Sequence, residues 1–119
     1  MRSIDMQNWS RRHHFNLFNT FNHPHFSMCV NMDITAFYPF VKRNGYSLTI
    51  SMVYIIARAS NAIPEFRQRI RGEQVVEHEI VNPGFSILID EDLFGFCDVE
   101  YTEDFAEFSM RANRNIAIL

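Results

Sequence analysis

The order of apolar and polar positions in the N-terminal third predicts a helix followed by a strand. In residues 9–21 ("WSRRHHFNLFNTF") apolar side chains recur at helical spacing, and Pro24 ends the helix. In residues 27–34 ("SMCVNMDI") every second side chain is apolar, which is the pattern of a strand with one buried face.

Two further helices are predicted from their cap residues and their apolar spacing. Thr35 is the expected N-cap of a short helix over residues 36–43, and Ser47 that of a longer helix over residues 48–62. Pro64 stops the longer helix, because a proline disfavours helical geometry in the residue before it.

Strands dominate the next stretch, and a helix follows them. Strands are expected over residues 73–80, 84–89 and 93–101, with Asn82-Pro83-Gly84 as the turn between the first two. Thr102 is the expected first residue of the last helix. The buried stripe of that helix is expected to comprise Phe105, Phe108, Ala112 and Ile116. The element order indicates an α+β fold.

Length and composition narrow the class of protein. The 119 residues fit a single domain over residues 1–119. The last helix runs to Leu119 without a terminator, which we interpret as a C-terminal truncation.

The net charge of -3 and the lack of a long basic run argue against nucleic acid or an anionic membrane as partner. No stretch approaches the ~20 apolar residues of a membrane helix. Two cysteines without CxxC spacing favour the cytoplasm.

Several motifs, in their order along the chain, resemble the N-terminal half of the chloramphenicol acetyltransferase family. They are "NWSRRHHF", "VNMDITAF", "ARASNAIPEFRQRI", "VVEHEIVNPGFSIL" and "EYTEDFAEF". The resemblance implies a mixed sheet packed against helices, of which this chain is an incomplete N-terminal portion. It also implies a homotrimer that uses acetyl-CoA as cosubstrate and acetylates a hydroxyl of chloramphenicol or a related small aromatic alcohol, which confers antibiotic resistance.

The family's catalytic motif is His-His-x-x-x-Asp-Gly, in which an imidazole acts as general base. The only His-His pair here begins at His13 and reads "HHFNLFN", without the Asp and Gly. We therefore expect no catalytic residue in this chain, and no activity from the 119 residues alone.

The resemblance also assigns positions around the acceptor, where aromatic and apolar side chains exclude water from the reacting hydroxyl. The implied acceptor-site residues are Leu17, Phe18, Asn22, Pro24, Phe26, Phe94 and Phe96. Arg11 resembles an arginine that holds the active-site region in place by ion pairing. Of the remaining phenylalanines, Phe15, Phe105 and Phe108 are expected in the core.

The remaining clusters of histidine, acidic and basic residues are interpreted as surface features and not as functional sites. His23 and His25 flank Pro24 without the spacing of metal ligands, so we expect a surface loop and no metal site. Glu77-His78-Glu79 is interpreted as a solvated strand face, and the basic residues 67–73 as an exposed helix end.

Two alternatives to the enzyme stay open. The first is a non-catalytic module that kept the acceptor pocket and serves ligand binding or oligomerisation. The second is the catalytic core of a dihydrolipoyl acyltransferase, which the N-terminal motifs fit less well.

Overall fold

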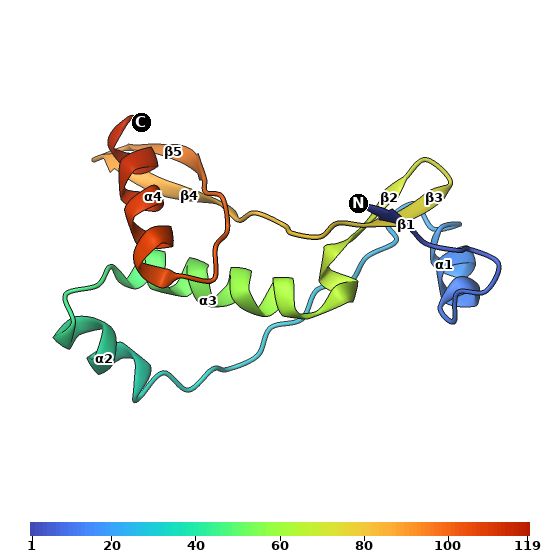
Figure 1. The fold of residues 1–119 in the computed structure, drawn as a ribbon, viewed down its shortest axis with the longest axis horizontal. Coiled ribbons are helices and arrows are strands. Elements are labelled where there is room, and N and C mark those ends of the chain that lie inside the picture. The colour runs from blue at the N-terminus through green and yellow to red at the C-terminus, as the bar shows by residue number, and fades with distance from the viewer.

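Four α-helices and two small antiparallel sheets build the fold, and the computed structural model describes all of residues 1–119 (Figure 1). In chain order the elements are β1 (Arg2–Ser3), α1 (Arg12–Phe18), α2 (Phe37–Arg43), α3 (Leu48–Ala62), the 3₁₀ helix η1 (Pro64–Arg67), β2 (Gln68–Arg71), β3 (Gln74–Glu77), β4 (Gly84–Asp90), β5 (Leu93–Asp98) and α4 (Phe105–Ala117). The molecule is elongated, with extents of 50 × 32 × 28 Å. An α+β fold is thereby confirmed.

The two sheets lie apart along the long axis (Figure 1). One has the strand order β1-β3-β2, and the other consists of β4 and β5. The strands predicted on either side of Asn82-Pro83-Gly84 therefore do not pair with each other, and the extended residues 78–83 connect the two sheets.

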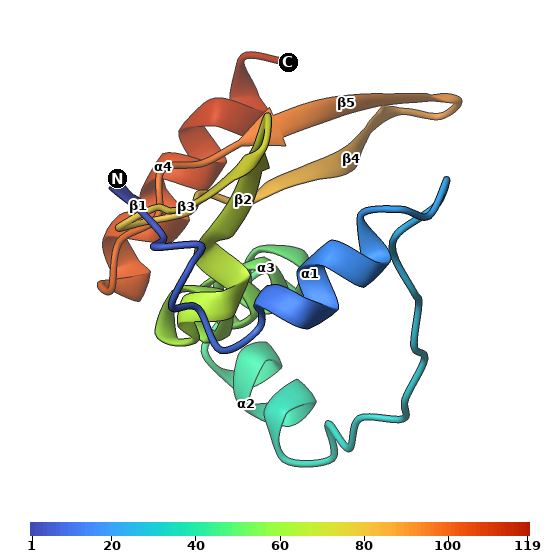
Figure 2. The ribbon, with the colours of Figure 1, turned by 90° about the vertical axis from the view of Figure 1, so that its right-hand side faces the viewer.

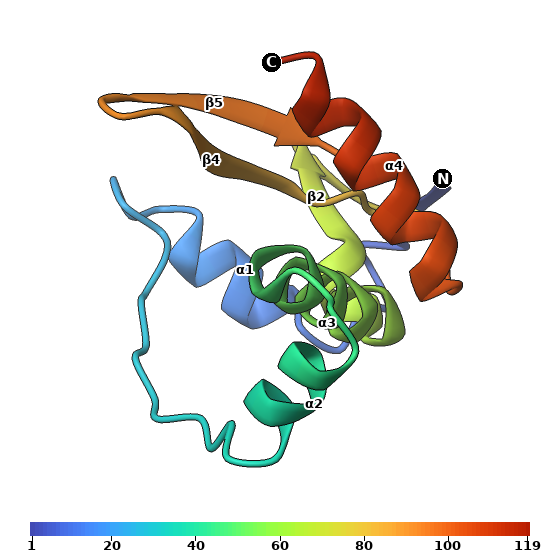
Figure 3. The same ribbon diagram turned by 90° about the vertical axis from the view of Figure 1, so that its left-hand side faces the viewer.

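Helix α3 is the central element, with α4 on one side and α2 on the other (Figure 3). Its predicted bounds are confirmed, and the Ser47 hydroxyl accepts a hydrogen bond from the Ile50 N–H at 3.2 Å. None of the helices has the length and apolar character that a membrane span requires.

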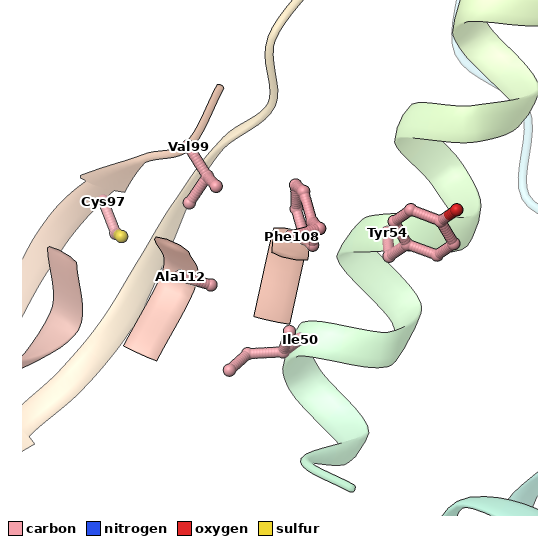
Figure 4. Close-up of a cluster of buried hydrophobic side chains, with 6 residues drawn as sticks. All are labelled: Ile50, Tyr54, Cys97, Val99, Phe108 and Ala112. Atoms are coloured by element: carbon pink, nitrogen blue, oxygen red, sulfur yellow. The ribbon is translucent and has the colours of Figure 1, made fainter. Parts of the chain in front are cut away.

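The core lies where α4 packs against α3 and β5. Phe108 and Ala112 of α4 are fully buried, as their helical spacing predicted. They form one cluster with side chains from α3, from β5 and from the segment that follows β5 (Figure 4). The cluster comprises Ile50, Tyr54, Cys97, Val99, Phe108 and Ala112.

The strand predicted over residues 27–34 is not formed. These residues belong to a segment from 19 to 36, hereafter the connecting arm, which begins and ends in turns and links α1 to α2 (Figure 2). The N–H and C=O groups of a strand form hydrogen bonds with a neighbouring strand, and no other strand lies beside the arm. Its apolar side chains are consequently exposed, for example 75% for Met28 and 72% for Val30.

Three local predictions were wrong. Thr35 does not cap α2: its N–H and hydroxyl both donate to Asp33, and Ala36 is the residue before the helix. Asp104 rather than Thr102 caps α4. Of residues 67–73 only Arg67 ends a helix, the 3₁₀ helix η1, because from Gln68 on β2 and β3 form a hairpin with Gly72 at a φ of 63°.

Candidate functional site

A concave site of about 590 Å³ lies between α1, the start of the connecting arm and β2. We call it the α1 cavity. Its volume lies in the range of small-molecule sites, about 300–1,000 Å³. It is lined by Trp9, Arg11, His14, Phe15, Phe18, Asn19, Pro24, His25, Phe26 and Ile70.

Helix α1 supplies one wall through its helical repeat. Arg11, Phe15 and Phe18 are three or four residues apart, so their side chains project from the same side of the helix. Trp9 extends this wall, with its ring centroid 5.8 Å from that of Phe15. The Arg11 guanidinium lies 5.6 Å from the centre of the Trp9 ring, within cation–π range.

The connecting arm supplies the opposite wall. Pro24 and His25 turn the chain after α1, and Phe26 follows with 81% of its surface exposed. Ile70 of β2 completes the lining from a part of the sequence more than forty residues away. The cavity therefore depends on the β2–β3 hairpin lying next to α1, as Figure 1 shows.

Three of the expected acceptor-site residues come together in this cavity. Phe18, Pro24 and Phe26 line it, together with Arg11, for which an ion-pairing role was expected. No ion pair to Arg11 is present, and its guanidinium faces Trp9 instead.

The other four expected residues lie elsewhere. Leu17 and Asn22 are exposed near the cavity but do not line it. Phe94 and Phe96 lie on β5, with 62% and 74% of their surface exposed and their rings 5.5 Å apart. Because α1 and the β4–β5 hairpin occupy opposite ends of the long axis in Figure 1, these two rings do not reach the α1 cavity of the same chain.

Sequence reasoning missed six of the ten lining residues of the α1 cavity. Phe15 was expected in the core but lines the cavity, and the Trp9 ring lies beside it at an interplanar angle of 54°. The helical spacing of His14 and Phe15 with Phe18 was the available signal. No local signal pointed to Ile70, because its place depends on the contact between the β2–β3 hairpin and α1.

The chemistry of the α1 cavity is that of a binding site. Aromatic and apolar side chains form most of the surface, while Arg11, His14, Asn19 and His25 add polar groups. No carboxylate lines it, so a neutral or anionic ligand meets no charge repulsion there. No group of three or more His, Cys, Asp or Glu side chains in the chain is arranged to hold a metal ion.

Comparison with known proteins gives a single family. The sequence model described as chloramphenicol acetyltransferase matches residues 1–119. A chloramphenicol acetyltransferase of Proteus mirabilis is 32% identical over 115 residues, which are 96% of this chain and 53% of that protein. One from Bacillus pumilus is 31% identical over 108 residues, 90% of this chain and 49% of that protein.

A solved chloramphenicol acetyltransferase structure matches the fold, with a TM-score of 0.92 at 31% identity. The match covers 100% of this chain and 57% of that one. This chain therefore spans about half the length of the relatives it matches. It shares their sequence pattern and their backbone over all its residues, and it belongs to the chloramphenicol acetyltransferase family.

Proposed function

We propose that residues 1–119 supply the acceptor pocket of an acetyl-CoA-dependent O-acetyltransferase. The acceptor is chloramphenicol or a related small aromatic alcohol, and the α1 cavity is the part of the pocket that this chain provides. The observation that carries the proposal is the convergence of Phe18, Pro24 and Phe26 on one cavity in a chain of this family.

The lining suits an aryl alcohol for physical reasons. A flat ring gains dispersion and edge-to-face contacts from phenylalanine and tryptophan side chains, and such rings prefer centroid distances of about 4.5–7 Å. Apolar walls also keep water away from the hydroxyl that reacts. The histidine, asparagine and arginine side chains at the cavity offer hydrogen bonds to the polar groups of the ligand.

The reaction needs a general base, and the family's motif for that base is absent from residues 1–119. A base takes the proton of the acceptor hydroxyl, the oxygen attacks the thioester carbonyl of acetyl-CoA, and the thiol of coenzyme A leaves. The sequence after His13 lacks the Asp and Gly of His-His-x-x-x-Asp-Gly. The base is accordingly proposed to lie outside residues 1–119, on a neighbouring subunit of a homotrimer.

Exposed apolar surface supports the proposed assembly. Phe26, Met28, Val30 and Met32 alternate along the connecting arm and expose 81%, 75%, 72% and 67% of their surface. Contiguous apolar surface of this kind is typical of contacts with another chain segment. The same surface is the observation in favour of the second candidate, a non-catalytic ligand-binding or oligomerisation module.

The enzyme is further proposed to act in the cytoplasm, where acetylation of the antibiotic confers resistance.

An acetyl-transfer assay separates the two candidates. The 119-residue chain should release no coenzyme A thiol from acetyl-CoA in the presence of chloramphenicol. A fusion of residues 1–119 to the remaining C-terminal part of the Proteus mirabilis relative should release it, because that part is expected to carry the missing base. The C-terminal part alone is the control.

Two outcomes would contradict the proposal. Acetyl transfer by the 119 residues alone would mean that the general base lies within them. A fusion that folds and assembles as a trimer but stays inactive would favour the non-catalytic module.

A further inference from the structure

A second cavity of about 270 Å³ lies between α2, the first half of α3 and the start of α4. We call it the α2–α3 cavity, and it shares no lining residue with the α1 cavity. Figures 1 and 3 both show α2 on the side of α3 that faces away from the core. The cavity is lined by Phe37, Phe40, Val41, Tyr46, Ser51, Tyr54, Ile55 and Phe105.

Aromatic rings form a continuous wall of this cavity. The Tyr46 ring meets Phe105 edge to face at 5.0 Å, and Phe105 lies 5.1 Å from Tyr54. Phe40 extends the series, 6.2 Å from Tyr46. The Tyr54 ring is also stacked on Tyr101. Phe40, Tyr46 and Phe105, on the other hand, meet their neighbours in this series only edge to face or tilted, which is the arrangement that a further aromatic ring can extend.

One polar atom in the lining has no partner. Ser51 exposes 4% of its surface, and its hydroxyl Oγ is the only buried side-chain nitrogen or oxygen in the chain without a hydrogen bond. Its backbone N–H is already paired with the Ser47 carbonyl at 3.0 Å. The neighbouring buried hydroxyl, that of Tyr54, donates to the Glu103 carbonyl. Buried polar groups are normally hydrogen-bonded. The unpaired Ser51 hydroxyl in this apolar cavity therefore points to a ligand that forms a hydrogen bond with it.

We propose that the α2–α3 cavity binds a compact neutral aromatic molecule that carries one hydrogen-bonding group, such as a phenol. The ring packs against Tyr46 and Phe105, and the polar group bonds the Ser51 hydroxyl. A neutral ligand is required because no charged side chain lines the cavity. The volume is sufficient, since an engineered apolar cavity of about 150 Å³ in another protein takes up benzene.

The proposal does not depend on the proposed acetyl transfer, and binding of simple probes tests it. Phenol and toluene have similar ring size, but only phenol has a hydroxyl. Each is titrated into the 119-residue chain while the amide resonances are followed by NMR. Phenol should shift the amides of Val41, Ser51 and Ile55 and bind about tenfold more tightly than toluene, a difference of about 1.4 kcal/mol.

Two serine variants of α3 isolate the hydroxyl. Ser51→Ala should weaken phenol binding about tenfold and leave toluene binding unchanged. Ser60→Ala is the matched control, because Ser60 lies on the same helix but does not line the cavity. Circular dichroism of each variant verifies that the helices are retained, and Ser51→Thr, which keeps the hydroxyl, should restore phenol binding in part.

Three results would overturn the proposal. The first is the absence of amide shifts around the cavity on addition of phenol. The second is equal phenol affinity in the wild type and Ser51→Ala, which would mean that the hydroxyl is satisfied within the helix, for example by the Ser47 carbonyl. The third is a phenol-induced shift of the Trp9 side-chain resonance alone, which would place phenol in the α1 cavity.

Discussion

Glu77 of β3 is the carboxylate with the most partners in this chain. Its Oε1 accepts a hydrogen bond from the Gln68 amide at 3.3 Å and lies 3.3 Å from the Arg2 guanidinium. Its Oε2 lies 3.8 Å from the Arg67 guanidinium. The Gln68 hydrogen bond, followed by the Arg2 and Arg67 charges, lowers the pKa of Glu77 although partial burial opposes this. The sequence interpretation of a solvated strand face is therefore wrong for Glu77, whose side chain is 16% exposed, and Glu79 is exposed but lies after the end of β3.

The lowered pKa predicts how stability depends on pH. The Glu77 carboxylate stabilises the fold above its ordinary pKa of 4.5, and this contribution is lost as the pH falls from there through the lowered value. Urea unfolding of wild type and Glu77→Gln between neutral and acidic pH measures it. The free energy of unfolding of the variant should change less steeply with pH below 4.5 than that of the wild type.

Glu79→Gln is the matched control, because Glu79 is exposed on the same segment. Its pH profile should follow that of the wild type. The assignment fails if Glu77→Gln and Glu79→Gln have the same profile.

Among the elements, the helices and the strands β3, β4 and β5 were predictable, but strand β2 and the arrangement of the strands in two sheets were not. Helix α3 has its N-cap, its apolar spacing and its terminating proline within one short stretch, so local information suffices. The residues 27–34 have an equally clear alternating pattern, yet the alternation does not specify a partner strand. Strand β2 was missed for the opposite reason, because its pairing with β3 across Gly72 overrides a composition typical of an exposed helix end.

The helix caps predict a measurable order of stabilities. The Asp104 carboxylate accepts from the N–H groups of Ala106 and Glu107 at 2.9 and 3.4 Å, and its charge favours the positive end of the helix dipole. Ser47 accepts one such bond, at 3.2 Å. By urea denaturation Asp104→Ala should lower the free energy of unfolding by about 1–2 kcal/mol, and Ser47→Ala by about 1 kcal/mol.

Thr102→Ala provides the comparison for the cap of α4. Its hydroxyl accepts from the Asp104 N–H at 3.3 Å and donates to the Glu107 carboxylate at 3.5 Å. Since neither long contact pairs an N–H group of the helix, the loss should stay below about 0.5 kcal/mol. If Thr102→Ala destabilised the protein as much as Asp104→Ala, Thr102 would be the effective cap, as its sequence position first indicated.

At the scale of the whole molecule, α4, which carries much of the buried core, and α1, which lines the α1 cavity, lie toward opposite ends of the long axis (Figure 1). Only 11 of 119 residues are buried, and six of these form the cluster between α3, α4 and the end of β5. The resemblance named four residues that line the α1 cavity, Arg11 among them, without information on packing. Ile70 was beyond such reasoning, because its contribution follows from the tertiary position of the β2–β3 hairpin.

The small core predicts a strong dependence on Phe108. Phe108 is 0% exposed, and Phe108→Ala should cost about 3–5 kcal/mol, because contacts are lost and a cavity remains. Since small domains have only about 5–15 kcal/mol of stability, the variant should show an unfolding midpoint at much lower urea. Met110→Ala on the same helix, 65% exposed, should stay within about 0.5 kcal/mol of the wild type. Similar midpoints for both variants would contradict the assignment of the core.

The central claim, that the α1 cavity binds the aromatic acceptor, is tested most directly through Trp9. It is the only tryptophan of the chain and lines that cavity, and the nitrophenyl ring of chloramphenicol quenches indole fluorescence on contact. Chloramphenicol should quench the Trp9 fluorescence of the wild type in a saturable titration. Phe26→Ala should bind chloramphenicol with about tenfold lower affinity. Met28→Ala, on the same arm but outside the cavity, should titrate like the wild type. Quenching that never saturates, or the same titration curve for Phe26→Ala and Met28→Ala, would contradict the account.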